Sequence, residues 1–464
     1  MPPSPRFTFS DARHYLPYFL LLLVFVVGVW LILAAGSRLG PVNPTTVATP
    51  PANNVLWENF RTPLSILLTQ IIVILTMAGL FRRLFRRIHQ PPVMGEMIAG
   101  IVLGPSVLGL IYPPALSFLF PASSLETLRQ LSQIGVVLFM FIVGMELNVR
   151  YVREKGSTAV MISHASIIVP FLLGTALSLF LFRELAPAGT SFSAFALFIG
   201  VAMSITAFPV LARILEDRGL TNTTLGSIAL TCAAVDDVTA WCILALVIAL
   251  VKSTGLASSA MTIGLTLVFA LTMFFVVRPQ LARVIKDPDS QLHKRRLIPL
   301  ILAFVLSCAL LTETIGIHAL FGAFVAGVVM PPSTEFRSFL KDKLEAFGSY
   351  ALLPLFFAFT GLRTQVSLLN DWYGWLLCGV IILVAIAGKL GGSMLMSRWT
   401  GMSWTQSFSI GVLMNTRGLV ELVVLNIGYD LGILPGRIFA MMVIMALVTT
   451  FMTGPLLSLV KDRN

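Results

Sequence analysis

Two adjacent carboxylates, Asp236 and Asp237, stand within the apolar segment 223–251. A charged side chain at the centre of a bilayer costs about 2.5–3.5 kcal/mol even on a lenient insertion scale. Successive helical residues point about 100° apart, so one carboxylate can face a water-filled cavity while the other contacts a neighbouring helix. A buried carboxylate can be neutralised by a proton or by a cation. The pair therefore predicts a site at which the two compete; the alternative is a pair neutralised by other helices purely for assembly.

A second charge, Lys389, lies in the apolar segment 372–397, between glycines that permit close helix approach. A lone buried lysine needs a carboxylate partner, and the aspartate pair is the candidate. In the alternative, the lysine side chain extends to the membrane surface. Arg398, at the predicted helix end, lies about 13 Å away at ~1.5 Å rise per residue. That distance is long for a lysine, so the sequence favours an ion pair.

Two apolar segments carry signs of a break in the helix. In the first, Pro209 removes a backbone donor and frees backbone groups near Thr206. In the second, Arg417 and Glu421 lie at mid-membrane depth, four residues apart, where they can pair on one helix face. Unwound backbone survives there only inside protein or around a cavity. Together the segments predict crossed broken helices around a central site; for Pro209 alone, an ordinary kink is the alternative.

The composition indicates that membrane helices position these groups. Of 464 residues, 57% are hydrophobic and 11% are charged, whereas a soluble domain has roughly 25% charged residues. Apolar stretches of about 20 residues, enough to cross a bilayer, recur along the chain and predict an all-α polytopic membrane protein of about 13–14 transmembrane helices. The predicted helices are 14–36, 62–81, 91–110, 128–148, 157–182, 191–215, 223–251, 257–278, 297–315, 317–331, 346–362, 372–397, 403–427 and 437–460.

The first predicted helix, 14–36, is followed by a segment rich in Pro, Thr and Asn. We therefore expect two regions: residues 1–61, with an extra helix and a linker, and a membrane domain over 62–464. The apolar run of the first helix exceeds the roughly 7–15 residues usual in a signal peptide. A retained helix is therefore favoured over a cleaved signal.

Basic residues outnumber acidic ones, 32 to 21, for a net charge of +11. They concentrate in alternate connections by roughly three to one, which predicts an inner or plasma membrane protein with both termini in the cytoplasm. The excess therefore does not indicate a nucleic-acid partner. The chain has no P-loop motif, so uphill transport would need an ion gradient, and no cofactor is expected. An intramembrane aspartyl protease is disfavoured because no GxGD motif occurs, and we expect no enzyme activity.

The chain also repeats itself. Ala99–Ser106 is similar to Ala326–Ser333, and Leu138–Gly144 is similar to Leu355–Gly361, in the same order. The predicted topology runs the matched helices in opposite directions, so the halves, at approximately 62–251 and 297–460, would be inverted repeats of the kind common in secondary transporters. Chance similarity among glycine-rich apolar helices is the alternative.

An ordered set of motifs resembles the monovalent cation:proton antiporter-2 family, in its Kef-type and plant cation/H+ exchanger branch. The matching stretches are Gln90–Glu96, Ala99–Ser106, Phe141–Leu147, Ser204–Arg213, Ala233–Asp237, His318–Phe324 and Asn415–Leu422. The resemblance begins near residue 62 and covers the rest of the chain. The helix at 14–36 precedes the usual family pattern, so its role is not supported by the resemblance.

The resemblance implies two six-helix inverted repeats, and a core domain with crossed broken helices that moves like an elevator against a dimerisation domain. It implies a homodimer that exchanges K+ or Na+ for H+. By motif position, Asp237 would bind the monovalent cation and the proton, and Asp236 would pair with Lys389. Thr206 would add an oxygen ligand, and Arg417 and Glu421 would be the charges of the second broken helix.

A sodium-coupled organic-anion symporter of similar inverted-repeat fold is the alternative function, although an aspartate pair facing an anion argues against it. The sequence does not distinguish Na+, K+ and Li+, because ion selectivity depends on the fine geometry and field strength of the coordinating oxygens.

Overall fold

The structure is a computed structural model, and it describes residues 23–24, 27–31, 34, 59–146, 156–221, 223–252, 256–285, 291–331 and 334–461. The chain divides into two units, Met1–Arg61 and Thr62–Asn464. In the first unit, the described residues between 23 and 34 are helical. The rest of the helix predicted at 14–36 lies outside the described residues.

In the described part of the second unit, every regular element is a helix. The elements are α3 (Pro63–Arg87), α4 (Pro92–Leu103), α5 (Leu108–Ile111), α6 (Pro113–Leu119), α7 (Ala122–Glu146), α9 (Gly156–Leu185), α10 (Phe192–Ser204), α11 (Phe208–Asp217), α12 (Thr224–Lys252), α13 (Leu256–Thr272), η3 (Met273–Val277), α14 (Arg278–Val284), α15 (Gln291–Ile315), α16 (Ala319–Val328), α17 (Thr334–Phe347), η4 (Gly348–Leu352), α18 (Leu353–Arg363), η5 (Val366–Leu368), α19 (Trp372–Ile386), η6 (Ala387–Gly391), α20 (Gly392–Trp399), α21 (Trp404–Met414), α22 (Leu419–Asp430) and α23 (Gly436–Lys461).

Among the described residues, ten helices are long and apolar enough to cross a membrane, or eleven if the bent pair α21–α22 is one span. The predicted helix 317–331 contains the shorter helix α16, and the predicted helix 346–362 is helical throughout, from the end of α17 through η4 into α18. The prediction of an all-helical polytopic membrane protein is therefore confirmed.

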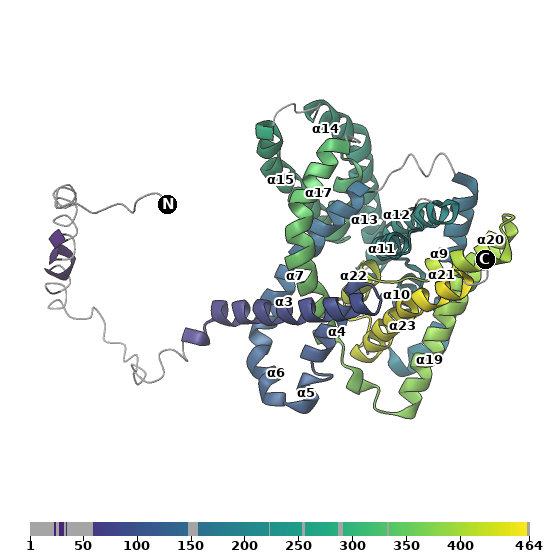
Figure 1. Ribbon diagram of the computed structural model, residues 1–464, viewed down its shortest axis with the longest axis horizontal. Helices are drawn as coiled ribbons and strands as arrows, with labels where there is room; N and C mark the ends of the chain where they lie inside the picture. The colour runs from purple at the N-terminus through teal and green to yellow at the C-terminus, as the bar shows by residue number, and fades with distance from the viewer. Residues whose placement is uncertain are drawn as a thin grey trace, which may run out of the picture. The chain divides into compact units, whose positions relative to one another are not determined.

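Helices from the two halves of the sequence interleave (Figure 1). Helix α4, which carries the start of Ala99–Ser106, packs on α18, which carries Leu355–Gly361. Helix α16, which carries the start of Ala326–Ser333, packs on α7, which carries Leu138–Gly144. A Cβ on Gly100 would lie 2.3 Å from a backbone carbonyl oxygen of α18, and one on Gly327 would lie 2.2 Å from a backbone carbonyl oxygen of α7. Gly361 and Gly144 meet the same two contacts from the other side. The repeat and its inverted orientation both stay predictions.

Both predicted breaks are present, and the unwound segments meet. Helix α10 ends at Ser204, and α11 begins at Phe208 after an extended stretch. Pro209 lies in the first turn of α11, where its missing N–H costs no hydrogen bond. Helices α21 and α22 are bent by 42°. The N–H of Ala207 in the first break donates to the carbonyl of Thr416 in the second, at 3.1 Å, which ties the two breaks together.

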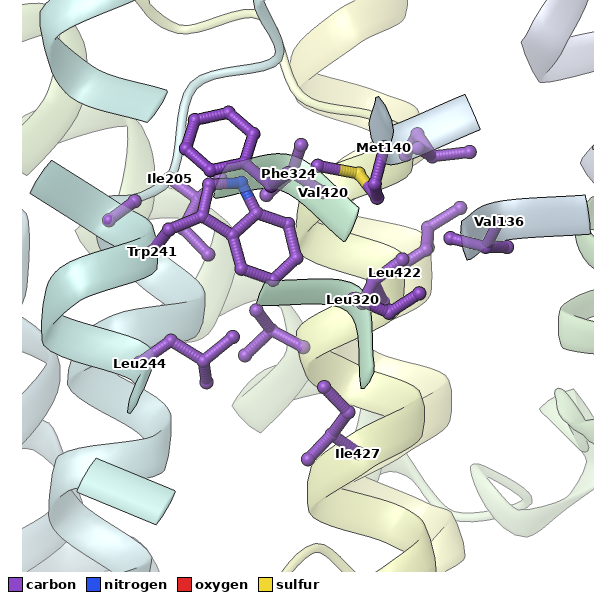
Figure 2. Packing of buried hydrophobic residues seen from close by; sticks show 14 of the residues in the cluster. Val136, Met140, Ile205, Trp241, Leu244, Leu320, Phe324, Val420, Leu422 and Ile427 are labelled. Carbon is purple, nitrogen blue, oxygen red and sulfur yellow. The ribbon is translucent and has the colours of Figure 1, made fainter. Parts of the chain in front are cut away.

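A large buried apolar cluster surrounds this crossing. Figure 2 shows Trp241 of α12 beside Phe324 of α16, with Ile205 of the first break and Val420 of α22 nearby. The rings of Trp241 and Phe324 stack with centroids 6.0 Å apart and planes 26° apart. Aromatic packing therefore surrounds the break in α10 and the start of α22.

The close contact at Gly327 gives a stability test. Gly327→Ala places a methyl group against the backbone of α7, and such overpacking costs about 1–3 kcal/mol. The matched control is Gly379→Ala in α19, where an added Cβ meets nothing within 4 Å and alanine favours the helix by up to ~1 kcal/mol. In thermal unfolding in detergent, the Gly327 variant should melt below the parent and the Gly379 variant at or above it. Equal melting temperatures would contradict the packing described.

Candidate functional site

Asp236 lies in α12, is fully buried, and has both carboxylate oxygens hydrogen-bonded. Its Oδ1 accepts from Ser163 Oγ at 2.5 Å. Its Oδ2 accepts from Ser166 Oγ at 2.9 Å and from Thr206 Oγ1 at 2.6 Å. Lys389 Nζ lies 3.2 Å from the same Oδ2. Four donors thus satisfy both oxygens of this carboxylate.

Lys389 lies in η6, a single π-helical turn between α19 and α20. Such turns insert into α-helices frequently at functional sites. Its ammonium group donates to Asp236, to the carbonyl of Ser166 at 3.0 Å and to the carbonyl of Ser204. The side chain has no exposed surface, so it does not extend to the membrane surface, and the ion-pair alternative is the one the structure supports.

The helix of Lys389 approaches α9 closely because its neighbours are glycines. A Cβ on Gly388 would lie 2.8 Å from the Cα of Pro170, and one on Gly392 would lie 3.0 Å from the Cβ of Val169. Small residues are what allow helix backbones to approach in a membrane. The short approach brings the lysine onto the serines of α9.

Asp237 is as buried as its neighbour, with 1% of its surface exposed. No side chain among the residues that the structure describes donates a hydrogen bond to either of its carboxylate oxygens, and the backbone N–H of Phe208, at the start of α11, faces the carboxyl group. An isolated ionised carboxylate is too costly to bury, so this group needs a proton or a cation. The two aspartates therefore differ in what surrounds them and not in depth.

The end of α10 is the meeting point of two cations. Arg417 donates through Nη1 to the carbonyl of Ala202 at 2.9 Å and through Nη2 to the carbonyl of Met203 at 2.7 Å, and Lys389 binds the carbonyl of Ser204. These carbonyls form the negative end of the helix dipole. The break therefore leaves its freed acceptors satisfied.

The second break is held by its own partners. Arg417 pairs with Glu421 at 3.3 Å, both fully buried. The hydroxyl of Thr450 in α23 accepts from the N–H of Arg417 at 2.9 Å and donates to its carbonyl at 2.8 Å. One threonine thus replaces both hydrogen bonds that an unbroken helix would supply to this residue.

Comparison with known proteins gives the family. The family model described as sodium/hydrogen exchanger, transmembrane, matches residues 71–460. The chain belongs to the sodium/hydrogen exchanger family. It is similar to the Na(+)/H(+) antiporter NhaS4 of Synechocystis, with 45% identity over 85% of this chain and 96% of that protein.

Other members of the family are longer. The cation/H(+) antiporter 17 of Arabidopsis thaliana is 41% identical over 90% of this chain and 50% of that protein. The K(+)/H(+) antiporter 1 of Saccharomyces cerevisiae is 35% identical over 88% of this chain and 48% of that protein. The chain therefore spans about half the length of these plant and yeast exchangers. The identity to the plant exchanger agrees with the resemblance to the plant branch.

The fold is that of a sodium/proton exchanger of known structure. The sodium proton antiporter MjNhaP1 of Methanocaldococcus jannaschii superposes with a TM-score of 0.61 over 85% of this chain and 96% of that one, at 15% identity. At this identity, the likeness shows the shared fold alone.

The exchanger site contains two contacts predicted from the sequence, Lys389 with Asp236 and Arg417 with Glu421. Thr206 donates its hydroxyl to Asp236 at 2.6 Å, and its Oγ1 also lies 3.3 Å from the carbonyl of Met414; its expected part as an oxygen ligand stays a prediction. The hydroxyl of Thr206 therefore supports the ion-paired aspartate here. The functional roles of these residues stay predictions.

Sequence reasoning missed Ser163, Ser166 and Thr450. The two serines lie three residues apart in an apolar helix, hence on one face, and that spacing was a usable signal. Thr450 gave no such signal, since threonines in a membrane helix commonly bond to their own backbone. Among the described residues, no group of three or more His, Cys, Asp or Glu could hold a metal ion.

The buried pair in the second break predicts a large coupling. Arg417→Met leaves Glu421 buried and unpaired, and breaking such a pair costs about 3–5 kcal/mol. Arg417→Met with Glu421→Met removes both charges and should recover part of that loss. Thermal unfolding of the single and double variants measures the coupling; a double variant less stable than the single one would contradict it.

The two bonds of Thr450 to Arg417 predict a second effect. Thr450→Val leaves a buried N–H unpaired, which costs about 1–3 kcal/mol. The matched control is Thr449→Val, since the Thr449 hydroxyl bonds only to carbonyls of its own helix. Thermal unfolding should show a much larger loss for Thr450→Val. Similar losses for the two variants would show that Thr450 does not brace the break.

Proposed function

We propose that this chain exchanges a monovalent cation, Na+ or K+, for protons, with the two competing for Asp237. The observation that carries the proposal is the buried Asp237 carboxylate, whose oxygens accept no hydrogen bond from any described side chain. The family and the names of its relatives, which are Na(+)/H(+), K(+)/H(+) and cation/H(+) antiporters, support the same function.

The chemistry requires one carboxylate that changes partner and one that does not. Asp236 contacts Lys389 and three hydroxyls, and we assign it the constant role. Asp237 is neutralised by a proton in one half of the cycle and by the cation in the other. Because a buried bare carboxylate is costly, the site does not cross the membrane empty and charged, and the two fluxes are coupled.

Alternating access would come from an elevator-type movement of two groups of helices. The helices around the site, α9 to α12 and α19 to α23, pack mainly on one another, and so do α3, α4, α7, α15, α16 and α18. We assign the first group to a moving core domain and the second to a dimerisation domain of a homodimer in the lipid bilayer.

At the boundary between these two groups of helices lie polar contacts that can break and re-form. Asp430, at the end of α22, pairs with Arg363 of α18 at 2.8 Å and with Arg129 of α7 at 3.5 Å. Arg363 also donates to Asn426 of α22 at 3.0 Å. Partly exposed ion pairs are weak, so they can break and re-form as the groups move.

The concentration of basic residues in alternate connections also supports a cell-membrane location with both termini in the cytoplasm. An impermeant label on an added C-terminal cysteine would test this orientation. Labelling of intact cells from outside would contradict it.

Asp237→Asn should abolish exchange. The test follows the collapse of a pH gradient in proteoliposomes on addition of Na+, K+ or Li+ in turn, with and without a membrane potential. The asparagine keeps the shape of the side chain, so thermal unfolding should change little, and flux should fall to that of empty liposomes. Full retained exchange would overturn the assignment, and sodium-dependent uptake of an organic anion without proton exchange would favour the symporter.

A further inference from the structure

We propose that Asp430 and Asn426 form an entry site for the exchanged cation at the outer end of α22, and that Arg363 occupies this site while the outer side is closed. The charge bias of the connections predicts that this end of the helix faces outward. The inference rests on the proposed function. It goes beyond it by assigning a second cation site to residues that the exchange at Asp237 does not use.

The guanidinium of Arg363 lies among groups that suit a small cation. Its Nη2 lies 2.8 Å from Oδ1 of Asp430, and its Nη1 donates to Oδ1 of Asn426 at 3.0 Å. Carboxylate and amide oxygens are ligands that hard cations prefer. The guanidinium carbon also lies 4.4 Å from the centre of the Phe359 ring, and aromatic faces attract cations. The arginine thus stands where an alkali cation would find the same partners.

The amide of Asn426 is turned so that its oxygen faces the arginine. Its Nδ2 donates to Oγ1 of Thr360 and to the carbonyl of Leu422, both at 2.9 Å, which uses both of its N–H groups. The hydroxyl of Thr360 donates in turn to the carbonyl of Phe356 at 2.9 Å, so its oxygen accepts from the amide. This arrangement leaves the oxygen of Asn426, a residue only 8% exposed, for a cationic partner.

The surrounding charges also favour a cation at this point. Helices α18 and α22 both end here, at Arg363 and Asp430, and the last carbonyls of a helix carry partial negative charge. Arg129 lies 3.5 Å from Oδ2 of Asp430 but donates to both oxygens of Glu126, at 2.5 and 2.8 Å. Another carboxylate therefore balances Arg129, and Asp430 has Arg363 as its close partner.

A narrow cavity begins at these charges and lies between α7, α16, α18 and α22. The residues of α22 that line it are spaced three and four apart and so share one face; they are Val423, Asn426, Ile427 and Asp430. About 20 Å³ is open to a water molecule, which is room for roughly one. A hydrated cation therefore does not pass in this state, and the outer side is closed.

The inner end of the cavity is apolar. Figure 2 shows Val136 of α7 and Leu320 of α16 near Leu422 of α22, with Ile427 further toward the end of that helix. Val420, near the beginning of α22, lies beside the broken helices. The cavity therefore follows α22 between its charged end and the break. A cation that displaces the arginine enters this path when the outer side opens.

The experiment measures the Michaelis constant for Na+ or K+, whichever the parent exchanges, from each side of the membrane. Right-side-out and everted membrane vesicles with a pH-sensitive dye present the outer and the inner face to the added cation. Arg363→Gln vacates the site and should lower the outer constant. Asp430→Asn removes the carboxylate and should raise it. Each change should be about two- to fivefold, as expected for a partly exposed charge contact.

The matched control is Glu126→Gln, which removes a carboxylate from the same surface and should leave the outer constant unchanged. Opposite shifts for Arg363→Gln and Asp430→Asn distinguish an entry site from a contact that merely holds the outer side closed. Either variant would break such a contact, so both would then shift the constant in one direction. Shifts of the same sign, unchanged constants in both variants, or an equal effect of Glu126→Gln would overturn the proposal.

Asn426→Leu removes the second oxygen of the site and should also raise the outer constant. It takes the place of Asp430→Asn if that variant does not fold, and an unchanged outer constant there overturns the proposal equally. Failure of the proposed function is distinct, because the parent itself would then show no cation-dependent proton flux or would lose none of it on Asp237→Asn.

Discussion

The ion pair between Lys389 and Asp236 is the interaction on which the rest of this site depends. Removing two charges from water costs several kcal/mol per ion, and their attraction offsets this only when the remaining donors and acceptors are satisfied. That condition accounts for the local structure: a π turn carries the lysine, glycines let its helix approach α9, and the break in α10 leaves the carbonyl of Ser204 as an acceptor. Elements from both halves of the chain are fixed at one point.

The neighbouring carboxylate shows that chemical identity does not decide a role in this protein. Asp236 and Asp237 are equally buried and adjacent. A rotation of about 100° along α12 gives the first a cation and three hydroxyls and leaves the second without side-chain donors among the described residues. In the second break, too, the surrounding groups decide what a buried charge does. There a buried arginine is satisfied by its own glutamate and by the carbonyls that the first break exposes.

The helical membrane fold and the charged residues of the site could be predicted from the sequence, because charges and prolines in apolar segments are rare and costly. Asp236, Lys389, Arg417 and the break at Pro209 all stood out for that reason. The partners of neutral groups could not be predicted. Whether Thr206 turns to one aspartate or the other depends on the rotation and depth of α10 against α12, which follow from packing over the whole bundle. The helix predicted at 317–331 was too long at both ends compared with α16 for a related reason, since apolar residues buried against other helices give the same pattern as those facing lipid.

The separation of the ion pair along the chain has a consequence for how the protein is made. Asp236 precedes Lys389 by 153 positions, whereas Ser163, Ser166 and Thr206 precede Asp236 by 73, 70 and 30. When α12 leaves the ribosome, the hydroxyl donors already exist and the lysine does not. Asp236 therefore enters the membrane with neutral partners alone, and its counter-charge arrives only with the last membrane helices. A chain cut short before α19 lacks the lysine, so the charge of Asp236 acquires its partner only once η6 has been made.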